Sequence, residues 1–388
     1  MSSLRTRPDP GRAAASPFRR VVFAAALGIL ACATLLPAVA ASKPGTPARG
    51  VVETLPPQIS DAAFWQMIKD FSEPSGYFRS DNFLSNEHAF QEVIPRFRAA
   101  VPKGGVYLGV GPEQNFTYVA ALRPKLAFII DIRRQNMIEQ LLYKALFELS
   151  ADRVEFVSRL FARKRPTDLD VTSSVDALFE GLSSTPKSEE LFAQTLRAVK
   201  ERLVKDHHLA LTTEDLKSLE YVYNTFYTVG PEIAYTFTVG QFSRGRFPTY
   251  TELMTETDAN GEQHGYLATE EHFRILKGLQ SRNLIVPLVG DFSGDKVLRS
   301  VARYLREHDA PVTAFYISNV EQYLFEDGTT WRRFLANMAL FPLDNNSTLL
   351  RSVSNRGFQF RLGLIADLLA AFREGKIETY ADAIALSQ

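Results

Sequence analysis

Cysteine is almost absent from this chain, which has one in 388 residues, Cys32. A single cysteine forms no intramolecular disulfide, so a disulfide framework is excluded. Cys32 lies in an N-terminal stretch that we expect to be removed, which would leave no thiolate chemistry in the rest of the chain. The formal net charge is zero at pH 7, so the overall charge does not indicate nucleic acid as a partner.

Several sequence signatures of function are also missing. There is no G-x-S-x-G motif for a serine nucleophile and no internal repeat. His264 and His272 lie near each other, but no His/Asp/Glu spacing here is typical of a metal site, so we predict no metal. His207 and His208 follow a charged segment and are expected to be solvated.

The first 41 residues have the pattern of a secretory signal. A basic region contains five arginines, an uncharged and mostly apolar run extends over 21–41, and Ala38-Val39-Ala40 provides a cleavage site. The pattern predicts a periplasmic or otherwise exported protein, and the run is also long enough for an uncleaved anchor. Cleavage would remove five arginines and one aspartate, which leaves a charge of −4.

The export route and the junction with the fold can also be read from this region. Arg19 and Arg20, followed by two valines, resemble a twin-arginine signal, and an ordinary basic region is the alternative. Cys32 is in a poor lipobox, because apolar sequence continues past it. Residues 42–58 are rich in Pro, Gly and Ala, which predicts a disordered linker before a fold that begins near Ile59.

The stretch 105–136 organises the rest of the chain, and it reads GVYLGVGPEQNFTYVAALRPKLAFIIDIRRQN. A short apolar strand is followed by the turn Gly109-Val110-Gly111, a helix over 114–122, a second strand over 126–130, and Asp131. Glycines allow close approach of a ligand, and Asp131 lies twenty residues past Gly111, the spacing of a ribose-binding acid. The pattern predicts a nucleotide-binding βαβ unit, and a tight turn without a ligand is the alternative.

This motif differs from both the dinucleotide-binding pattern and the methyltransferase pattern. The dinucleotide pattern has a third glycine where Gln114 stands, and the methyltransferase pattern has an acid where Tyr107 stands. Arg133 and Arg134 open the next helix, which is predicted to extend to Leu149.

The middle of the chain is predicted to be an insertion and a lid. Residues 151–157 resemble a third strand, and the same letters also fit a helix. The pattern from 168 to 228 is helical, with a capping box beginning at Thr212. Residues 229–268 are rich in Thr, Tyr, Phe and Gly and contain the turn 258–261, which predicts a β-hairpin lid or a plain surface hairpin.

The last third of the chain repeats the strand–loop–helix–strand pattern. Strands are expected at 284–289 and 311–317 with a helix at 296–308 between them, then a strand at 347–354 and a closing amphipathic helix at 358–373. Parallel strands of this kind place ligands beyond their carboxyl ends. The polar residues at those ends are Gly109, Gly111, Asp131, Asp291, Ser318, Asn319 and Glu321. The loop 77–87 precedes the first of these strands, so Asp81, Asn82 and Asn86 either face the same site or act as helix caps.

The stretches GVYLGVGPEQNF, AFIIDIRRQN, GDFSGDK and YISNVEQYLF resemble an uncharacterised family of bacterial proteins, mostly exported, over nearly all of the chain after residue 41. The order of strands is in turn similar to the class I, S-adenosylmethionine-dependent methyltransferase fold. That resemblance implies S-adenosylmethionine as the cofactor, with Gly109 and Gly111 at its methionine part and Asp131 at its ribose. It also implies Asp291 near the adenine side and Asn319 near the methyl group.

We therefore predict an α/β, Rossmann-like domain over 59–388, with a mostly parallel sheet, a helical insertion and a β-hairpin lid. The predicted function is methyltransferase-like, with Asn319 or Glu321 orienting the acceptor. The alternatives are an NADP-dependent oxidoreductase, in which Arg133 or Arg134 meets the 2′-phosphate, and a non-catalytic exported binding or scaffold protein. The expected partner is a small molecule and not nucleic acid, with membrane contact only through the signal or anchor segment.

Overall fold

The computed structural model describes residues 54–235, 247–354 and 357–388. A six-stranded sheet runs through the molecule in the order β3-β2-β1-β4-β5-β6. The strands are β1 (Val106–Val110), β2 (Leu126–Asp131), β3 (Ile285–Val289), β4 (Val312–Ser318), β5 (Leu343–Ser354) and β6 (Phe358–Leu364). Neighbouring strands from β3 to β5 are parallel, and β6 is antiparallel to β5. The predicted α/β, mostly parallel, Rossmann-like fold is confirmed.

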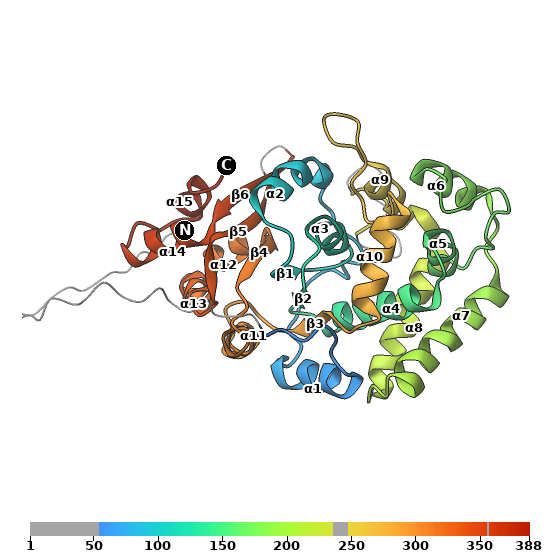
Figure 1. Cartoon of the computed structure of the whole chain (residues 1–388), viewed down its shortest axis with the longest axis horizontal. Coiled ribbons are helices and arrows are strands. Elements are labelled where there is room, and N and C mark those ends of the chain that lie inside the picture. The colour runs from blue at the N-terminus through green and yellow to red at the C-terminus, as the bar shows by residue number, and fades with distance from the viewer. Residues whose placement is uncertain (1–53, 236–246, 355–356) are drawn as a thin grey trace, which may run out of the picture. The chain divides into compact units, whose positions relative to one another are not determined.

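The central strands are continuous apolar runs because both faces of the sheet are covered. Every residue of β2 and β3 is buried, which matches parallel strands packed between helices. Figure 1 shows α2 (Ile94–Ala100) and α3 (Gln114–Leu122) above the sheet, and α1 (Asp61–Phe71) and α11 (Val297–Glu307) below it. The strand order reverses between β1 and β4, so their carboxyl ends form the crevice in which such sheets bind ligands.

The other helices extend the fold at its two ends (Figure 1). Between β2 and β3 come α4 (Arg134–Leu149), α5 (Arg153–Leu160), α6 (Val175–Ser184), α7 (Glu189–Glu201), α8 (Thr213–Val229), α9 (Tyr250–Thr255) and α10 (Glu270–Gln280). After β4 come α12 (Val320–Glu326), α13 (Thr330–Met338), α14 (Ile365–Arg373) and α15 (Tyr380–Ala385). Short turns are η1 (Phe90–Val93), the π-turn η2 (Arg202–Asp206) and η3 (Gly230–Glu232).

The N-terminal boundary of the fold lies a few residues earlier than predicted. Ser60 caps α1 as expected, its side chain accepting a hydrogen bond from Ala63 N. The backbone N–H of Thr54 donates to His308 O, and Leu55 packs against the core. Residues 54–58 therefore belong to the fold and not to a disordered linker. The predicted signal and the rest of the linker lie outside the described residues.

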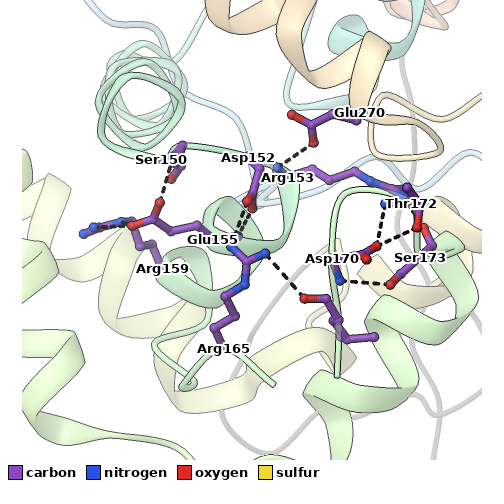
Figure 2. Close-up of polar contacts among 12 residues, drawn as sticks. Ser150, Asp152, Arg153, Glu155, Arg159, Arg165, Asp170, Thr172, Ser173 and Glu270 are labelled. Atoms are coloured by element: carbon purple, nitrogen blue, oxygen red, sulfur yellow. Dashed lines mark hydrogen bonds and ion pairs between the residues drawn. The ribbon is translucent and has the colours of Figure 1, made fainter. Parts of the chain in front are cut away.

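The predicted strand at 151–157 is wrong, because this segment begins α5. Figure 2 shows the polar contacts that start the helix. The Asp152 carboxylate caps Glu155 N at 2.9 Å, and the Glu155 side chain accepts from Ala151 N and pairs with Arg159 one turn later. Arg153 donates to the carbonyl oxygens of Leu267 and Ala268. The local contacts of Asp152 and Glu155 favour the helix over a strand, and the bonds of Arg153 tie the helix to a distant segment.

The predicted helical insertion is present. In the described part of 229–268, however, a helix and a turn stand where a β-hairpin was predicted. Thr212 and Asp215 form the predicted capping box at the start of α8. Helix α9 and a turn at Asp258–Gly261 follow residue 247, and the only β-contact there is one bridge between Ala234 and Thr249. Thr249 and Glu252 form a second capping box, which explains the helix. Residues 236–246 lie outside the described residues.

Two further predictions need correction. The expected helix at 358–373 begins with β6, because this segment pairs with β5 from Ser354↔Phe358 to Thr348↔Leu364 before α14 starts. His207 is not solvated, because its ring lies between Glu148 and Asp61 with both N···O distances at 2.7 Å. None of the described helices is long and apolar enough to cross a membrane.

Candidate functional site

A cavity of about 220 Å³ lies at the carboxyl ends of the central strands. Its walls come from the ends of β1, β2, β3 and β4 and from the loop that contains residues 78–87. This is the crevice that the reversal of strand order predicts. The predicted polar strand ends therefore meet at one place, and Asn82 and Asn86 of the preceding loop line the same cavity.

Of the two glycines of the predicted turn, Gly109 belongs to β1 and Gly111 follows it, and they have different reasons to be glycine. A Cβ atom at Gly109 would lie 1.9 Å from Asn115 Oδ1, and Gly109 is not part of the cavity lining. Gly111 lines the cavity with φ at +83°, and a Cβ there would meet no atom within 4 Å. Gly109 thus allows Asn115 to fold against the strand, while Gly111 provides open backbone at the cavity.

Asp131 lines the cavity but is already paired. Arg133 donates to Asp131 Oδ1 from its backbone N at 2.8 Å and from Nε at 3.0 Å, and to Oδ2 from Nη2 at 2.9 Å. A carboxylate has about four acceptor positions, so one remains on Oδ2. Arg134 points elsewhere, since its Nε and Nη2 bind the carboxylate of Asp215 at 2.6 and 2.8 Å.

Asp291 and Asn319 also line the cavity, from the ends of β3 and β4. Asp291 Oδ1 accepts from the N and Oγ of Ser293 at 2.7 and 2.9 Å, as a turn-forming aspartate does. Among the described residues, Asp291 Oδ2 has no hydrogen-bond partner. Asn319 precedes α12, and within the described residues its side chain has one hydrogen bond, a long 3.4 Å contact that Oδ1 accepts from Ser318 Oγ.

Glu321, predicted to be catalytic, does not line the cavity. Its side chain is buried against Arg351 of β5, with Arg351 Nη2 and Glu321 Oε1 at 3.2 Å and a closer contact through Arg351 Nε. Both side chains are about 1% exposed. Glu321 is the second residue of α12, so it is turned away from Asn319 and neutralises a buried arginine in place of contacting a ligand.

The cavity has an acidic residue that the sequence did not single out, Glu87. Its carboxylate is 1% exposed and accepts three hydrogen bonds. Oε2 accepts from Gln114 Nε2 at 2.9 Å and from Tyr316 OH at 2.8 Å, and Oε1 accepts from Ser318 Oγ at 2.5 Å. One acceptor position therefore remains on Oε1.

Backbone strain supports this arrangement around Glu87. Ser318 has φ at +51°, a left-handed conformation that is rare for a residue with a side chain. Burial raises the pKa of Glu87 above its ordinary value, while the donors from Ser318, Gln114 and Tyr316 act in the opposite direction. A strained backbone that delivers a hydroxyl to a buried carboxylate is typical of a functional site.

No local signal pointed to Glu87. It lies at the end of the loop 77–87, and the first helical turn, η1, starts only at Phe90, so Glu87 stays in the loop. Gln114 was read as a missing glycine, whereas its amide connects Glu87 to the Tyr118 hydroxyl at 2.5 Å. The one available signal was the position of Glu87 in the loop before β1, the first strand of the predicted nucleotide-binding unit.

Aromatic rings form much of the remaining cavity wall. Phe78 and Tyr323 make an edge contact with ring centroids 6.0 Å apart, and Tyr316 packs on Tyr118 at 4.9 Å. Tyr235 and Phe292 complete the aromatic lining. Such rings can stack on a flat base or face a positive charge.

The charged groups of this lining are mostly acidic. Three carboxylates, from Glu87, Asp131 and Asp291, face one guanidinium, that of Arg133. Within the part of the chain that the structure describes, no group of three or more His, Cys, Asp or Glu side chains could hold a metal ion.

Cavity and topology define a Rossmann-like α/β protein with a crevice at the reversal of strand order. The chain belongs to the family described as domain of unknown function DUF7790, whose model matches residues 82–373 and so includes every cavity residue except Phe78. No curated protein shows significant similarity to the chain.

Proposed function

We propose that this protein binds an adenosine-type ligand with a positive centre, of the S-adenosylmethionine class, and is methyltransferase-like. The observation that carries the proposal is the cavity at the reversal of strand order, in which three carboxylates face one already paired arginine. S-adenosylmethionine has a positive sulfonium, which acidic groups and aromatic faces attract. Gly111 offers open backbone for the ligand to approach closely.

Within this proposal, each cavity residue has a separate task. The remaining acceptor position on Glu87 Oε1 receives a donor or the positive end of the ligand, and the one on Asp131 Oδ2 receives a ribose hydroxyl. Asn319 orients the acceptor molecule. Methyl transfer needs aligned donor and acceptor more than a strong acid or base, so the buried position of Glu321 does not remove a necessary group.

The oxidoreductase alternative is less well supported by the same geometry. NADP needs cations for its phosphates. Arg133, the guanidinium that lines this cavity, is held by Asp131, and Arg134 does not line the cavity. The acidic lining would also repel a phosphate.

A second candidate function, ligand binding without transfer, is favoured by one observation. Of the two residues predicted to be catalytic, Glu321 is withdrawn into its pair with Arg351, and only Asn319 faces the cavity. A protein that has kept the cavity and lost the chemistry would have this arrangement.

Calorimetry with S-adenosylmethionine, its demethylated product and NADP tests the proposal. We expect the first two ligands to bind and NADP not to bind. Glu87→Gln should weaken S-adenosylmethionine by about 1.5–3 kcal/mol, the scale of a hydrogen bond to a charged group. Folding should tolerate this change, because the amide oxygen keeps the contacts of Oε2 and the Ser318 hydroxyl can accept from the new amide.

Glu92→Gln is the matched control, since Glu92 is a nearby exposed glutamate outside the cavity. If the wild type binds neither S-adenosylmethionine nor its product at millimolar concentration, the proposal is abandoned. Binding of the methyl donor without any formation of its demethylated product, tested against a panel of small acceptors, would favour the second candidate.

A further inference from the structure

A second cavity, of about 300 Å³, adjoins the first. Phe78 and Arg133 line both cavities and so form a shared wall. The rest of the second lining comes from residues 75–81 and from Arg134 and Gln135 at the start of α4. Two cavities separated by one ring and one guanidinium are suited to two molecules that must meet.

The charges of the two cavities are opposite. The second is lined by three guanidinium groups, from Arg79, Arg133 and Arg134, and by one carboxylate, Asp81. The partner of Arg133, Asp131, faces the first cavity, and the partner of Arg134, Asp215, lines neither. The carboxylate of Asp81 is near the Tyr221 hydroxyl, at 3.4 Å. The second cavity therefore favours an anion, whereas the first favours a cation.

One polar atom of the second lining lacks the partner that buried atoms normally have. Gln135 Nε2 is buried and has no hydrogen-bond partner among the described residues. More than nine in ten buried polar groups are paired, so this orphan indicates a missing partner. An amide nitrogen only donates, so that partner must supply an acceptor oxygen.

We propose that the second cavity binds the oxyanion, a carboxylate or a phosphate, of the small molecule that receives the methyl group. The guanidinium groups of Arg79 and Arg134 and the amide of Gln135 are the donors. This inference rests on the proposed function, because it names the acceptor for the donor bound in the first cavity. In the transfer, the acceptor's nucleophilic atom bonds to the methyl carbon as the carbon–sulfur bond breaks. The sulfur keeps the electron pair, and any proton on the nucleophile leaves to water.

The test is calorimetry of the whole protein with inorganic phosphate and, separately, with succinate, in a chloride buffer of low ionic strength. We expect one of the two to bind, which also distinguishes phosphate from carboxylate. Arg79→Gln should weaken this binding about fivefold, the upper end for an exposed charge pair. Gln135→Glu, which places an acid at the orphan amide, should abolish it.

Arg98→Gln is the matched control, because Arg98 is an exposed arginine that lines neither cavity. Arg134 is left intact, since its removal would leave Asp215 buried without its partner. S-adenosylmethionine binding should be the same in the wild type, Arg79→Gln and Arg98→Gln proteins, because neither arginine lines the first cavity.

The two proposals fail in different ways. If S-adenosylmethionine binds but neither oxyanion does, or if Arg98→Gln weakens the oxyanion as much as Arg79→Gln, the anion site is overturned and the proposed function stands. If an oxyanion binds and responds to Arg79→Gln and Gln135→Glu while S-adenosylmethionine does not bind, the anion site is supported and the proposed function is overturned.

Discussion

Glutamates are buried in two regions of this molecule, and their hydrogen-bond and ion-pair partners differ between the two regions. At the carboxyl edge of the sheet, Glu87 accepts three hydrogen bonds and Glu321 is paired with Arg351. Between α3 and α4, and among the described residues, the side chain of Glu113 accepts just two long bonds, both at 3.3 Å from Ser85 N, and both carboxyl oxygens of Glu139 lack a partner. All four glutamates are 1% exposed or less.

The comparison teaches that hydrogen-bond partners set how far burial raises the pKa of a buried acid. Burial raises the pKa of Glu113 to about 8. Burial, and then repulsion from Glu113, raises the pKa of Glu139 well above its ordinary value. We therefore expect two neutral carboxyl groups between α3 and α4 at neutral pH. At the sheet edge, burial also raises the pKa of Glu87, but its hydrogen-bond donors oppose that rise.

The neutral region continues along one face of α4. Asn136, Glu139, Gln140 and Tyr143 occur at spacings of three and four residues and each has a buried polar atom without a partner. Gln140 Nε2 donates to Gly111 O at 3.2 Å, so this face lies behind the glycine turn. Internal water is the ordinary occupant of such a polar interior.

The largest expected effect is on the pH dependence of folding. A carboxyl group whose pKa is higher in the folded state holds its proton more tightly there, so it destabilises the fold once it must ionise. The stability should fall as pH rises from about 4.5 to about 8, by up to roughly 5 kcal/mol from Glu113 alone. Guanidinium unfolding at a series of pH values should show this slope in the wild type and a flatter one in Glu113→Gln. An equal slope in both proteins would contradict a neutral Glu113.

The next effect concerns the ion pair at the sheet edge. Glu321→Gln leaves Arg351 buried without its counter-charge, which should lower the free energy of unfolding by about 3–5 kcal/mol. Chemical denaturation at pH 7 measures it. Exchange of both partners for apolar residues, Glu321→Leu with Arg351→Met, should recover much of the loss. A loss below about 1 kcal/mol for Glu321→Gln would mean that the pair is not formed.

An effect of the opposite sign is expected for the same substitution behind the glycine turn. Glu139→Gln should raise the free energy of unfolding at pH 7, because the native carboxyl group must hold a proton that the unfolded chain releases, whereas the amide has nearly the same shape and does not ionise. The contrast between Glu139→Gln and Glu321→Gln is the sharpest test of the two-region comparison. Equal losses at the two positions would show that burial alone sets the charge.

The sheet and its edge could be predicted because their signals are local. Helix α3 spans the expected residues 114–122, since the preceding glycine turn and the following Pro124 limit it. Strands β1 to β4 are continuous apolar runs bounded by turns. Short segments whose sequence pattern fits both a helix and a strand were assigned wrongly. Residues 153–160 are a helix because Asp152 caps them, and 358–364 are a strand because β5 offers a partner.

The candidate site was predictable as a place but not as a set of contacts. Gly111, Asp131, Asp291 and Asn319 meet at the cavity, as the rule for parallel strands predicts. Gly109 and Glu321 do not, although each is next in sequence to a cavity residue. Spacing alone does not say to which side a side chain turns at the end of a strand or the start of a helix.

The sequence by itself determined the alternation of strands and helices and the polar character of the strand ends, because these depend on neighbours a few residues apart. Only the tertiary structure decided which polar groups meet. Glu87 finds Tyr316 across 229 residues, and Glu321 finds Arg351 across 30. A carboxylate takes its charge and its role from such partners, and the chain brings them together only when the sheet forms.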